Sequence, residues 1–177
     1  MNTIRAGTLL LEPQLKSHAA EMFAVLSDPA IYEFENEAPS SEEALWQRYA
    51  KLESRRSADG TEQWLNWVIK LPTGALAGFM QATVLVGGRA YVAYEIGSPF
   101  WRQGVASTAL RAVLRELGER YYVRDAFAVL KAANYRSLGL LSKVGFGPIP
   151  PAARPPWAAE AGEVVVHKAI GNAENAV

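Results

Sequence analysis

Trp101-Arg102-Gln103-Gly104-Val105-Ala106-Ser107 is the stretch that most restricts the fold of this chain. It lies between a strand-like run at residues 91–96 and a helical pattern whose apolar residues share one face. The first N–H groups of a helix have no partner within the helix, and the helix dipole adds positive potential there. Such a strand, turn and helix start are suited to hold a phosphate, although a lone glycine is equally consistent with an ordinary turn.

The composition restricts the class of protein. The 177 residues are half hydrophobic, with 18 basic and 18 acidic side chains, which suits one domain over residues 1–177. The zero formal net charge argues against a nucleic-acid partner. The lack of cysteine excludes disulfides, a thiolate zinc site and a cysteine nucleophile. Without a signal-peptide core or an apolar run of ~20 residues, we expect a cytoplasmic location and no membrane partner.

Apolar periodicity and turn residues predict a mixed α/β fold. Tight turns at 72–74 and 87–88 predict an antiparallel meander. Ser40 and Glu43 fit a capping box for the second helix. The expected elements are a strand at 8–11, helices at 15–26 and 42–54, strands at 64–71, 76–86 and 89–96, a helix ending near 120, a strand at 126–130, a helix at 134–145 and a strand at 163–170.

Two motifs, in order along the chain, carry a resemblance to a known family. The first, W-R-Q-G-V-A at 101–106, is similar to the Q/R-x-x-G-x-G/A pyrophosphate loop of the GNAT acetyl-CoA-dependent N-acetyltransferases. It matches at Gly104 and Ala106 and departs at Trp101. The second, Asn134-x-x-Ser137 followed by L-S-K-V-G-F at 141–146, is similar to N-x-x-S-x-x-x-L-x-K-x-G-F of the RimJ/RimL-like branch, the ribosomal-protein N-terminal acetyltransferases, where a tryptophan at the first loop position is also typical.

The resemblance covers about residues 8–170 and implies both the fold and the cofactor. It implies an α/β (mixed α+β) GNAT fold, with a central, twisted, mostly antiparallel sheet of splayed strands flanked by helices. Acetyl-CoA would lie where the strands ending near Ile96 and Leu130 splay apart. A primary amine, from a peptide or a small molecule, would then attack the thioester directly.

The resemblance also assigns the residues that would bind the cofactor. The turn would hold the two bridging phosphates through its backbone N–H groups, and Arg102 would add charge. Gly104 lets the backbone approach closely, because it has no side chain. The phosphate-binding residues are Arg102, Gln103, Gly104, Val105, Ala106 and Ser107. Asn134 would bond the pantetheine arm, although a helix N-cap explains it equally well. Backbone N–H groups near Ile96 would stabilise the oxyanion.

Glu95 is the candidate proton acceptor. An amine with a pKa of ~10 must lose a proton before it can attack, and related enzymes use a glutamate on the corresponding strand. The alternative is a solvated or salt-bridged strand residue, because successive side chains alternate between faces. Many GNAT enzymes protonate the departing thiolate with a tyrosine, seven residues after the motif asparagine. Here Leu141 stands at that position, so either Ser137, Tyr135 or water replaces the tyrosine, or the thiolate leaves without a general acid.

The sequence indicates the residues that would bind the acceptor less clearly than those that would bind the cofactor. Glu33, Glu35 and Glu37 lie in a loop that borders the acceptor site in the family, where they could attract a cationic amine, or they could form a solvated loop. The bulky aromatic side chains at 64, 67 and 79 fit a core better than a ligand site. His18 and His167 have no partners at ligand spacing, so we expect no metal.

Other functions remain open. One alternative is a non-catalytic acyl-CoA-binding or sensor module on the same fold, which the missing tyrosine favours. A P-loop nucleotide enzyme is disfavoured because no Gly-Lys-Ser/Thr follows the turn. Nothing in the sequence selects among a protein N-terminus, an amino acid, a polyamine and an aminoglycoside as acceptor. An edge strand near the C-terminus would allow a homodimer.

Overall fold

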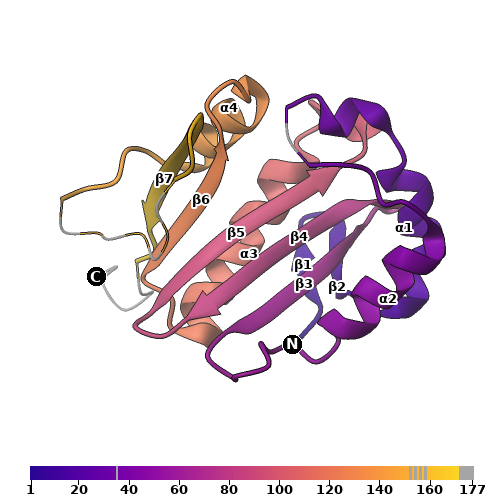
Figure 1. Cartoon of the computed structure of the whole chain (residues 1–177), viewed down its shortest axis with the longest axis horizontal. Coiled ribbons are helices and arrows are strands. Elements are labelled where there is room, and N and C mark those ends of the chain that lie inside the picture. Colours follow the sequence, from indigo (N-terminus) through magenta and orange to yellow (C-terminus); the bar gives the residue numbers. More distant parts are fainter. Residues whose placement is uncertain (35, 152, 154, 156, 158, 172–177) are drawn as a thin grey trace.

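A single seven-stranded sheet, in the order β1-β2-β3-β4-β5-β6-β7, forms the centre of the computed structural model, which describes residues 1–34, 36–151, 153, 155, 157 and 159–171 (Figure 1). The strands are β1 (Ile4–Ala6), β2 (Leu9–Pro13), β3 (Gln63–Lys70), β4 (Leu76–Leu85), β5 (Arg89–Ile96), β6 (Asp125–Lys131) and β7 (Glu163–Ala169). Neighbouring strands are antiparallel except β5 and β6, which are parallel. The expected mixed α/β class and mostly antiparallel sheet are confirmed.

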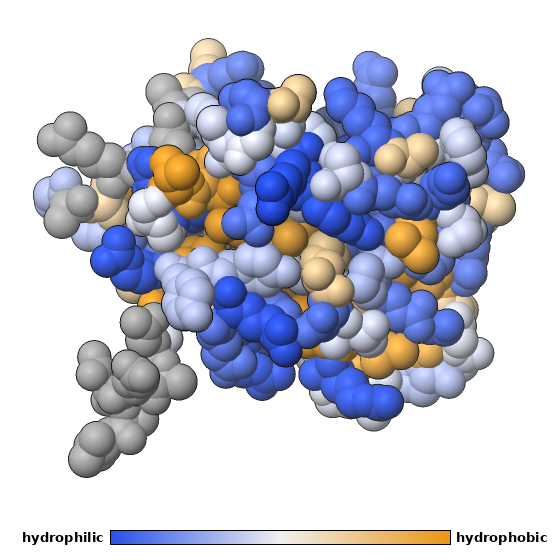
Figure 2. All heavy atoms as spheres, turned by 90° about the horizontal axis from the view of Figure 1, so that it is seen from below, coloured by the Kyte–Doolittle hydropathy of each residue, from blue (hydrophilic) through white to orange (hydrophobic). Residues whose placement is uncertain are grey.

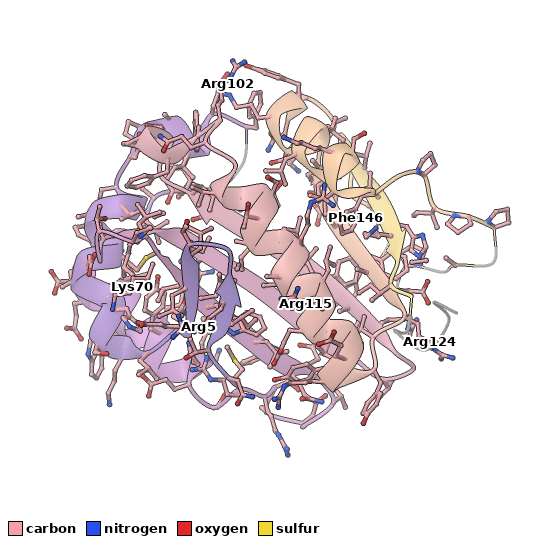
Figure 3. The ribbon with its side chains drawn as sticks, turned by 180° about the vertical axis from the view of Figure 1, so that it is seen from behind. Arg5, Lys70, Arg102, Arg115, Arg124 and Phe146 are labelled. Atoms are coloured by element: carbon pink, nitrogen blue, oxygen red, sulfur yellow. The ribbon has the colours of Figure 1, made fainter. Side chains whose placement is uncertain are left out.

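The helices cover both faces of this sheet. They are α1 (Ala19–Leu26), α2 (Glu42–Leu52), α3 (Val105–Tyr121) and α4 (Tyr135–Val144), with short 3-10 turns η1 (Lys16–His18), η2 (Pro29–Tyr32) and η3 (Ser98–Phe100). Helices α1 and α2 pack on each other, and α1 packs on β4. Helix α3 crosses the opposite face, and α4 packs against α3 (Figures 1 and 3).

Both faces of the sheet are therefore buried, so β3 does not alternate between buried and exposed residues. Residues 65–69 are all buried, since side chains of one parity enter the core beneath α3 and the others enter a second core beneath α1 and α2. Trp67 lies in the first core and Phe79 in the second, as expected. Trp64 is only half-buried, and its indole N–H donates to Glu62 at 2.8 Å.

Helix ends follow the local chemistry, with one correction. Ser41, rather than Ser40, caps α2: its hydroxyl accepts from the Ala44 N–H at 3.0 Å. Ser40 was the wrong choice because the helix starts one residue later than a Ser40 cap requires. Asn134 caps α4 as expected, and Gly145 ends it with φ 98°. The expected first strand is the second half of a β1–β2 hairpin, and the first helix begins later, at Ala19, after η1.

Strands β5 and β6 pair over only three residues each. The pairing joins residues 89–91 to residues 125–127 and then stops, so the end of β5 has β4 on one side alone. There the Gly97 N–H donates to the Ala77 carbonyl at 3.0 Å, and Gly78 stands opposite Ile96. Because N–H groups alternate sides along a strand, the Ile96 N–H and C=O point away from β4. They point toward the gap between β5 and β6, the region beyond residues 91 and 127 where the two strands no longer pair.

The surface seen in Figure 2 is mostly hydrophilic, with hydrophobic residues in separate patches. Within the part of the chain that the structure describes, no helix combines the length and the apolar character needed to cross a bilayer.

Gly78 holds the two strands in close contact, which makes it a stability test. Its φ is +149°, and a Cβ there would lie 2.1 Å from the Glu95 carbonyl oxygen, a backbone atom that cannot move alone. We expect Gly78→Ala to lower the free energy of unfolding by about 3–5 kcal/mol. Gly139, exposed within α4, is the control, since alanine there should raise that energy by ~0.5–1 kcal/mol. Urea unfolding followed by tryptophan fluorescence measures both; equal midpoints for the two variants would contradict the prediction.

Candidate active site

The turn before α3 presents an N-terminus that no side chain caps. Gly104 is the N-cap, in the left-handed conformation with φ 79°, and no side-chain cap hydrogen bond is found among the described residues. The Ser107 hydroxyl donates instead to the Gly104 carbonyl at 3.0 Å. The first amides of α3, those of Val105, Ala106 and Ser107, therefore lack a side-chain partner, which fits an anion site.

The side chains of the turn are held by its own carbonyl groups. The indole N–H of Trp101 donates to the Ile96 carbonyl at 2.7 Å, and the Gln103 amide donates to the Pro99 carbonyl at 2.7 Å. Trp101 therefore ties the turn to the end of β5, which explains why an aromatic side chain is useful at this position. Arg102, with φ 60°, is exposed at the outer edge of the molecule, where it can add positive charge (Figure 3).

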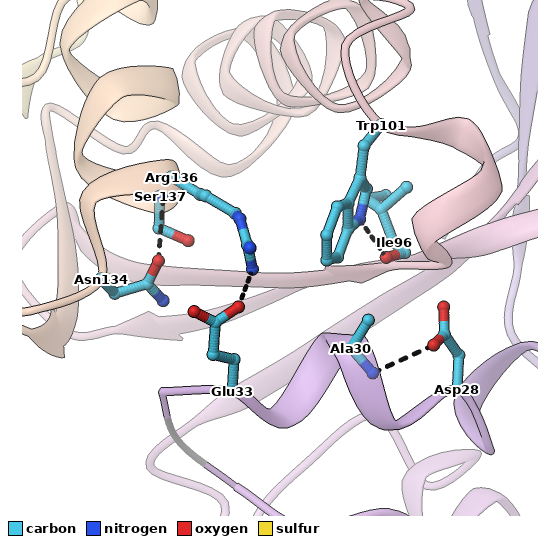
Figure 4. Close-up of polar contacts among 8 residues, drawn as sticks. All are labelled: Asp28, Ala30, Glu33, Ile96, Trp101, Asn134, Arg136 and Ser137. Carbon is cyan, nitrogen blue, oxygen red and sulfur yellow. Dashed lines mark hydrogen bonds and ion pairs between the residues drawn. The ribbon is translucent and has the colours of Figure 1, made fainter.

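Helix α4 begins on the other side of the gap. The Asn134 side-chain oxygen accepts from the Ser137 N–H at 3.0 Å, and Asn134 is 8% exposed. Figure 4 shows Asn134 and Ser137 on one side, Ile96 and Trp101 on the other, and the Arg136 side chain reaching between them toward Glu33. The structure thus brings together, around one gap, the expected cofactor residues of both motifs.

A bridge spans this gap that was not expected from the sequence. The Arg136 guanidinium pairs with the Glu33 carboxylate at 2.6 Å and lies 4.7 Å from the centre of the Trp101 ring (Figure 4). It also lies over Phe34 and Tyr135, whose rings meet edge to face at 5.4 Å. We call Glu33, Phe34, Trp101, Tyr135 and Arg136 the Arg136 bridge. In the sequence, the bridge is indicated only by the position of the cation Arg136 inside the Asn134-x-x-Ser137 motif.

The three loop glutamates have different surroundings. Glu33 belongs to the Arg136 bridge, so an acceptor would have to compete with Arg136 for its carboxylate. Glu35 lies outside the described residues. Glu37 is exposed and lines a cavity of about 420 Å³ between the sheet, α2 and the segment joining α1 to α2. The cavity is lined by Leu26, Tyr32, Asn36, Glu37, Pro39, Leu45, Arg48, Phe79, Gln81, Ala93, Tyr94 and Glu95.

Glu95 faces this cavity. It pairs with Phe79 across the β4–β5 ladder, so both side chains lie on the face covered by α1 and α2. The carboxylate of Glu95 accepts from the Asn36 amide at 3.4 Å. The sequence left open which face Glu95 occupies, and the structure places it in the cavity wall, next to the Ile96 amide. A carboxylate so placed can accept a proton from a molecule in the cavity.

Tyr32 closes the wall beside Glu95. Its hydroxyl donates to the Leu26 carbonyl at 2.7 Å. Burial, with the charge of Glu95 and a hydrogen bond to it, raises the pKa of Tyr32 far above its usual range. Tyr32 therefore stays protonated at neutral pH and acts as a hydrogen-bond donor rather than a base.

Asp28 fixes the loop that carries Tyr32. Its carboxylate accepts from the Ala30 N–H at 3.0 Å and from the Ser98 N–H at 2.9 Å, which joins η2 to the turn after β5 (Figure 4 shows the first bond). Hydrogen bonds from Ser98, and then from Ala30, hold the pKa of Asp28 below its usual value. The ionised carboxylate therefore stabilises the loop above the pH at which Asp28 protonates.

The remaining candidate side chains from the sequence analysis are those of Leu141, Tyr135 and His167. Leu141 is buried in the core, and Tyr135, which could replace the missing tyrosine, is exposed and packs on Phe34. His167 bonds Asp125 at 2.7 Å. Among the described residues there is no group of three or more side chains that could hold a metal ion.

Comparisons with known proteins decide the family. A model of the acetyltransferase (GNAT) domain matches residues 8–147. The chain belongs to the GNAT acetyltransferase family. The resemblance inferred from the two motifs is confirmed, as is the prediction that the protein is an N-acetyltransferase. A search among curated proteins finds no match.

Solved structures show the same fold at low sequence identity. A RimL ribosomal L7/L12 α-N-protein acetyltransferase in complex with coenzyme A has a TM-score of 0.76 at 18% identity, over 95% of this chain and 98% of that one. A ribosomal-protein-S5-alanine acetyltransferase from Vibrio fischeri has a TM-score of 0.75 at 13% identity, over 95% and 96%. A GNAT-family acetyltransferase from Bacillus anthracis has a TM-score of 0.74 at 16% identity, over 94% and 98%.

The Arg136 bridge can be tested for its contribution to stability. Both charged side chains are more than a third exposed, at 38% and 47%, so the ion pair itself should be weak. We expect Glu33→Gln to cost less than about 0.5 kcal/mol, and Arg136→Ala about 1 kcal/mol because it also loses ring contacts. A double-mutant cycle by urea unfolding should give a coupling below ~1 kcal/mol that decreases at high salt. A coupling above about 2 kcal/mol would show that the pair is a major stabilising contact.

Proposed function

We propose that the protein is an acetyl-CoA-dependent N-acetyltransferase in which a primary amine attacks the acetyl thioester directly, with Glu95 as proton acceptor. One observation carries the proposal: the Glu95 carboxylate lines the 420 Å³ cavity, and the adjacent Ile96 amide points into the gap between β5 and β6. The two groups that amine acetylation needs, a base and an amide donor, would therefore come from consecutive residues of β5.

The residues around the gap fit coenzyme A. The uncapped start of α3 offers the amides of Val105, Ala106 and Ser107 to the pyrophosphate, and Gly104 leaves the space before them open, because a Cβ there would meet no atom within 4 Å. Arg102 and Gln103 complete this turn. Asn134, at the start of α4, would hold the pantetheine arm. Acetyl-CoA, when bound, supplies the acetyl group as a thioester.

The chemical step balances with groups of this chain. The amine nitrogen forms a bond to the acetyl carbon, the carbon–sulfur bond breaks, and the amine proton passes to Glu95, directly or through water. The Ile96 N–H stabilises the negative charge that develops on the acetyl oxygen. The departing thiolate takes a proton from water, directly or through the Ser137 hydroxyl, which then receives a proton from water in turn; a thiol pKa of ~8.5 makes the thiolate a tolerable leaving group.

The acceptor is a peptide or small-molecule amine, drawn in by the acidic loop. Glu33 and Glu35 are the loop residues we propose for substrate binding, with Glu33 exchanging Arg136 for the cationic amine. Two of the similar structures are acetyltransferases named for ribosomal proteins, which supports a peptide amine as one candidate acceptor. A cytoplasmic location, one domain over 1–177 and a homodimer through the C-terminal edge strand stay predictions.

Replacing the proposed base tests the function. We expect Glu95→Gln to lower kcat by about 10²–10⁴-fold, because glutamine cannot accept the amine proton. The dissociation constant for coenzyme A should change less than about twofold, since Glu95 lies on the cavity side of the sheet. Steady-state kinetics and titration calorimetry measure the two quantities. Glu42→Gln, an exposed change in the first turn of α2, is the control.

The same experiment separates the enzyme from a non-catalytic acyl-CoA-binding module. A wild-type protein that binds acetyl-CoA but acetylates no member of an amine panel would favour the module. Glu95→Gln turnover equal to wild type would remove Glu95 from the mechanism.

A second substitution tests cofactor binding. We expect Gly104→Ala to raise the dissociation constant for coenzyme A by about tenfold, because the added methyl occupies the space before the α3 amides and strains a left-handed residue. Gly147→Ala is the matched control, since its Cβ also meets nothing within 4 Å but its φ is ordinary. Calorimetry on folded protein makes the comparison; equal affinities for the two variants would place the pyrophosphate elsewhere.

A further inference from the structure

We propose that the acceptor is a small zwitterion, a molecule carrying both the primary amine and a carboxylate, and that Arg48 and Gln81 bind its carboxylate. The inference rests on the proposed function, because it assigns the same cavity to the acceptor. It adds a substrate class that the acidic loop alone does not indicate. The evidence is an unused guanidinium in the cavity wall, with unpaired polar atoms buried behind it.

Arg48 is a cation that makes no ion pair or hydrogen bond with any residue that the structure describes. It projects from α2 and lines the cavity together with Glu37 and Glu95. None of the ion pairs or hydrogen bonds within the described part of the chain involves its guanidinium, whereas Arg136 is held by Glu33 at 2.6 Å. A guanidinium offers five N–H donors in a planar fork that matches a carboxylate. The side chain of Gln81, on β4, adds an amide that is likewise without a hydrogen bond among the described residues.

Polar atoms are buried behind these two residues. The Tyr49 hydroxyl and the Asn66 side-chain nitrogen have no hydrogen-bond partner within the described part of the chain, although Tyr49 and Asn66 are only 3% and 1% exposed. Both line a second, small cavity of about 10 Å³, and Arg48 and Gln81 line it too. This volume is at the lower limit for holding one water molecule. A water held there by Tyr49 and Asn66 would extend the donor group that faces the carboxylate.

The sheet sets the distance between the two ends of the acceptor. Asn66, Gln81 and Ala93 are paired across β3, β4 and β5, and Phe79 and Glu95 form the next row on the same face. Rows are separated by about 7 Å along a strand, and strands by about 4.8 Å. Glu95 therefore lies one row and one strand from Gln81, a backbone separation of roughly 8 Å. A compact amine with a carboxylate fits between them.

Charge also discriminates among amines. The second ammonium of a polyamine or an aminoglycoside would enter a cavity that holds Arg48 besides Glu37 and Glu95, and its like-charge contact with Arg48 is unfavourable. A neutral amine, or a carboxamide, brings no carboxylate to the guanidinium. The volume of 420 Å³ is in the range of small-molecule pockets. The pocket thus favours a free amino acid over a protein N-terminus, where an amide replaces the carboxylate.

The test compares matched acceptors by steady-state kinetics at saturating acetyl-CoA. The panel holds α- and ω-amino acids, the carboxamide of each, a diamine, an aminoglycoside and a serine-initiated peptide amide. We expect kcat/KM for the preferred amino acid to exceed that of its carboxamide by about 10–100-fold, the range of a charged hydrogen bond. Comparison of α- with ω-amino acids shows which distance between the amine and the carboxylate of the acceptor the cavity prefers.

Arg48→Met assigns the effect to one residue. We expect it to raise KM for the amino acid by about 10–100-fold with little change in kcat, and to leave kcat/KM for the carboxamide within about threefold. Gln81→Leu should have the same selective effect in weaker form. Lys51→Met, which removes an exposed cation on α2, should change neither. Calorimetry of the amino acid with the coenzyme A complex gives a readout that does not depend on turnover.

Each outcome separates the inference from the function it rests on. Turnover of the diamine, aminoglycoside or peptide amide, with the amino acids inactive, overturns the zwitterion and leaves the acetyltransferase intact. An Arg48→Met variant that loses all acceptors equally also overturns it, because the role of Arg48 is then structural. No acetylation of any amine by wild-type protein that binds acetyl-CoA contradicts the proposed function itself.

Discussion

The early end of the β5–β6 pairing is the constraint on which the rest of the site depends. Parallel neighbours normally continue their hydrogen bonds along both strands, but here they stop after residues 91 and 127. The last part of β5 is then an edge on one side, and the N–H and C=O groups that point away from β4 need other partners. Trp101 supplies one, because its indole bonds the Ile96 carbonyl. The amide of Ile96 itself remains directed into the gap, where a ligand can use it.

The gap stays open because the elements beside it are fixed by other contacts. Gly78 lets β4 approach the Glu95 carbonyl closely, which holds the end of β5 from the far side. Asp28 joins η2 to the turn that follows β5 through the Ser98 amide. Helix α4 is capped by Asn134 at the other border. Preorganised amides of this kind need no rearrangement when charge develops, which is the main requirement of an oxyanion site.

Local features of the site could be predicted from the sequence, and long-range ones could not. The turn at 101–107 and the Asn134 cap are encoded within a few residues, so their conformations follow from helix-end chemistry. The partner of Glu33 is Arg136, far along the chain, and no periodicity indicates that the two meet. The burial of both faces of β3 depended on where α1 and α3 pack.

The cavity residues that the sequence did not indicate share one property: their role depends on which residues surround them in the fold. Arg48 reads as an ordinary cation on a solvated helix until the cavity and the absence of a partner among the described residues are known. Gln81 and Asn66 read as polar residues in strands, and only the ladder register puts them in one row on the cavity side. A pattern of residue types records neither register nor the lack of a partner, so a sequence motif for this end of the cavity could not be expected.

Glu95 and Ile96, at the end of β5, direct two side chains and one backbone amide to three different surroundings. The Glu95 side chain faces the cavity beneath α1 and α2, the Ile96 side chain enters the core beneath α3, and the Ile96 amide points along the sheet into the gap. A shift of one residue would exchange the two side chains between faces and bury the carboxylate in an apolar core. Such a shift is prevented by the same close contact at Gly78, which admits no Cβ opposite Ile96. The position of the proposed base, Glu95, and that of the proposed amide donor, Ile96, are therefore fixed together by a single pairing register, and neither can be altered without the other.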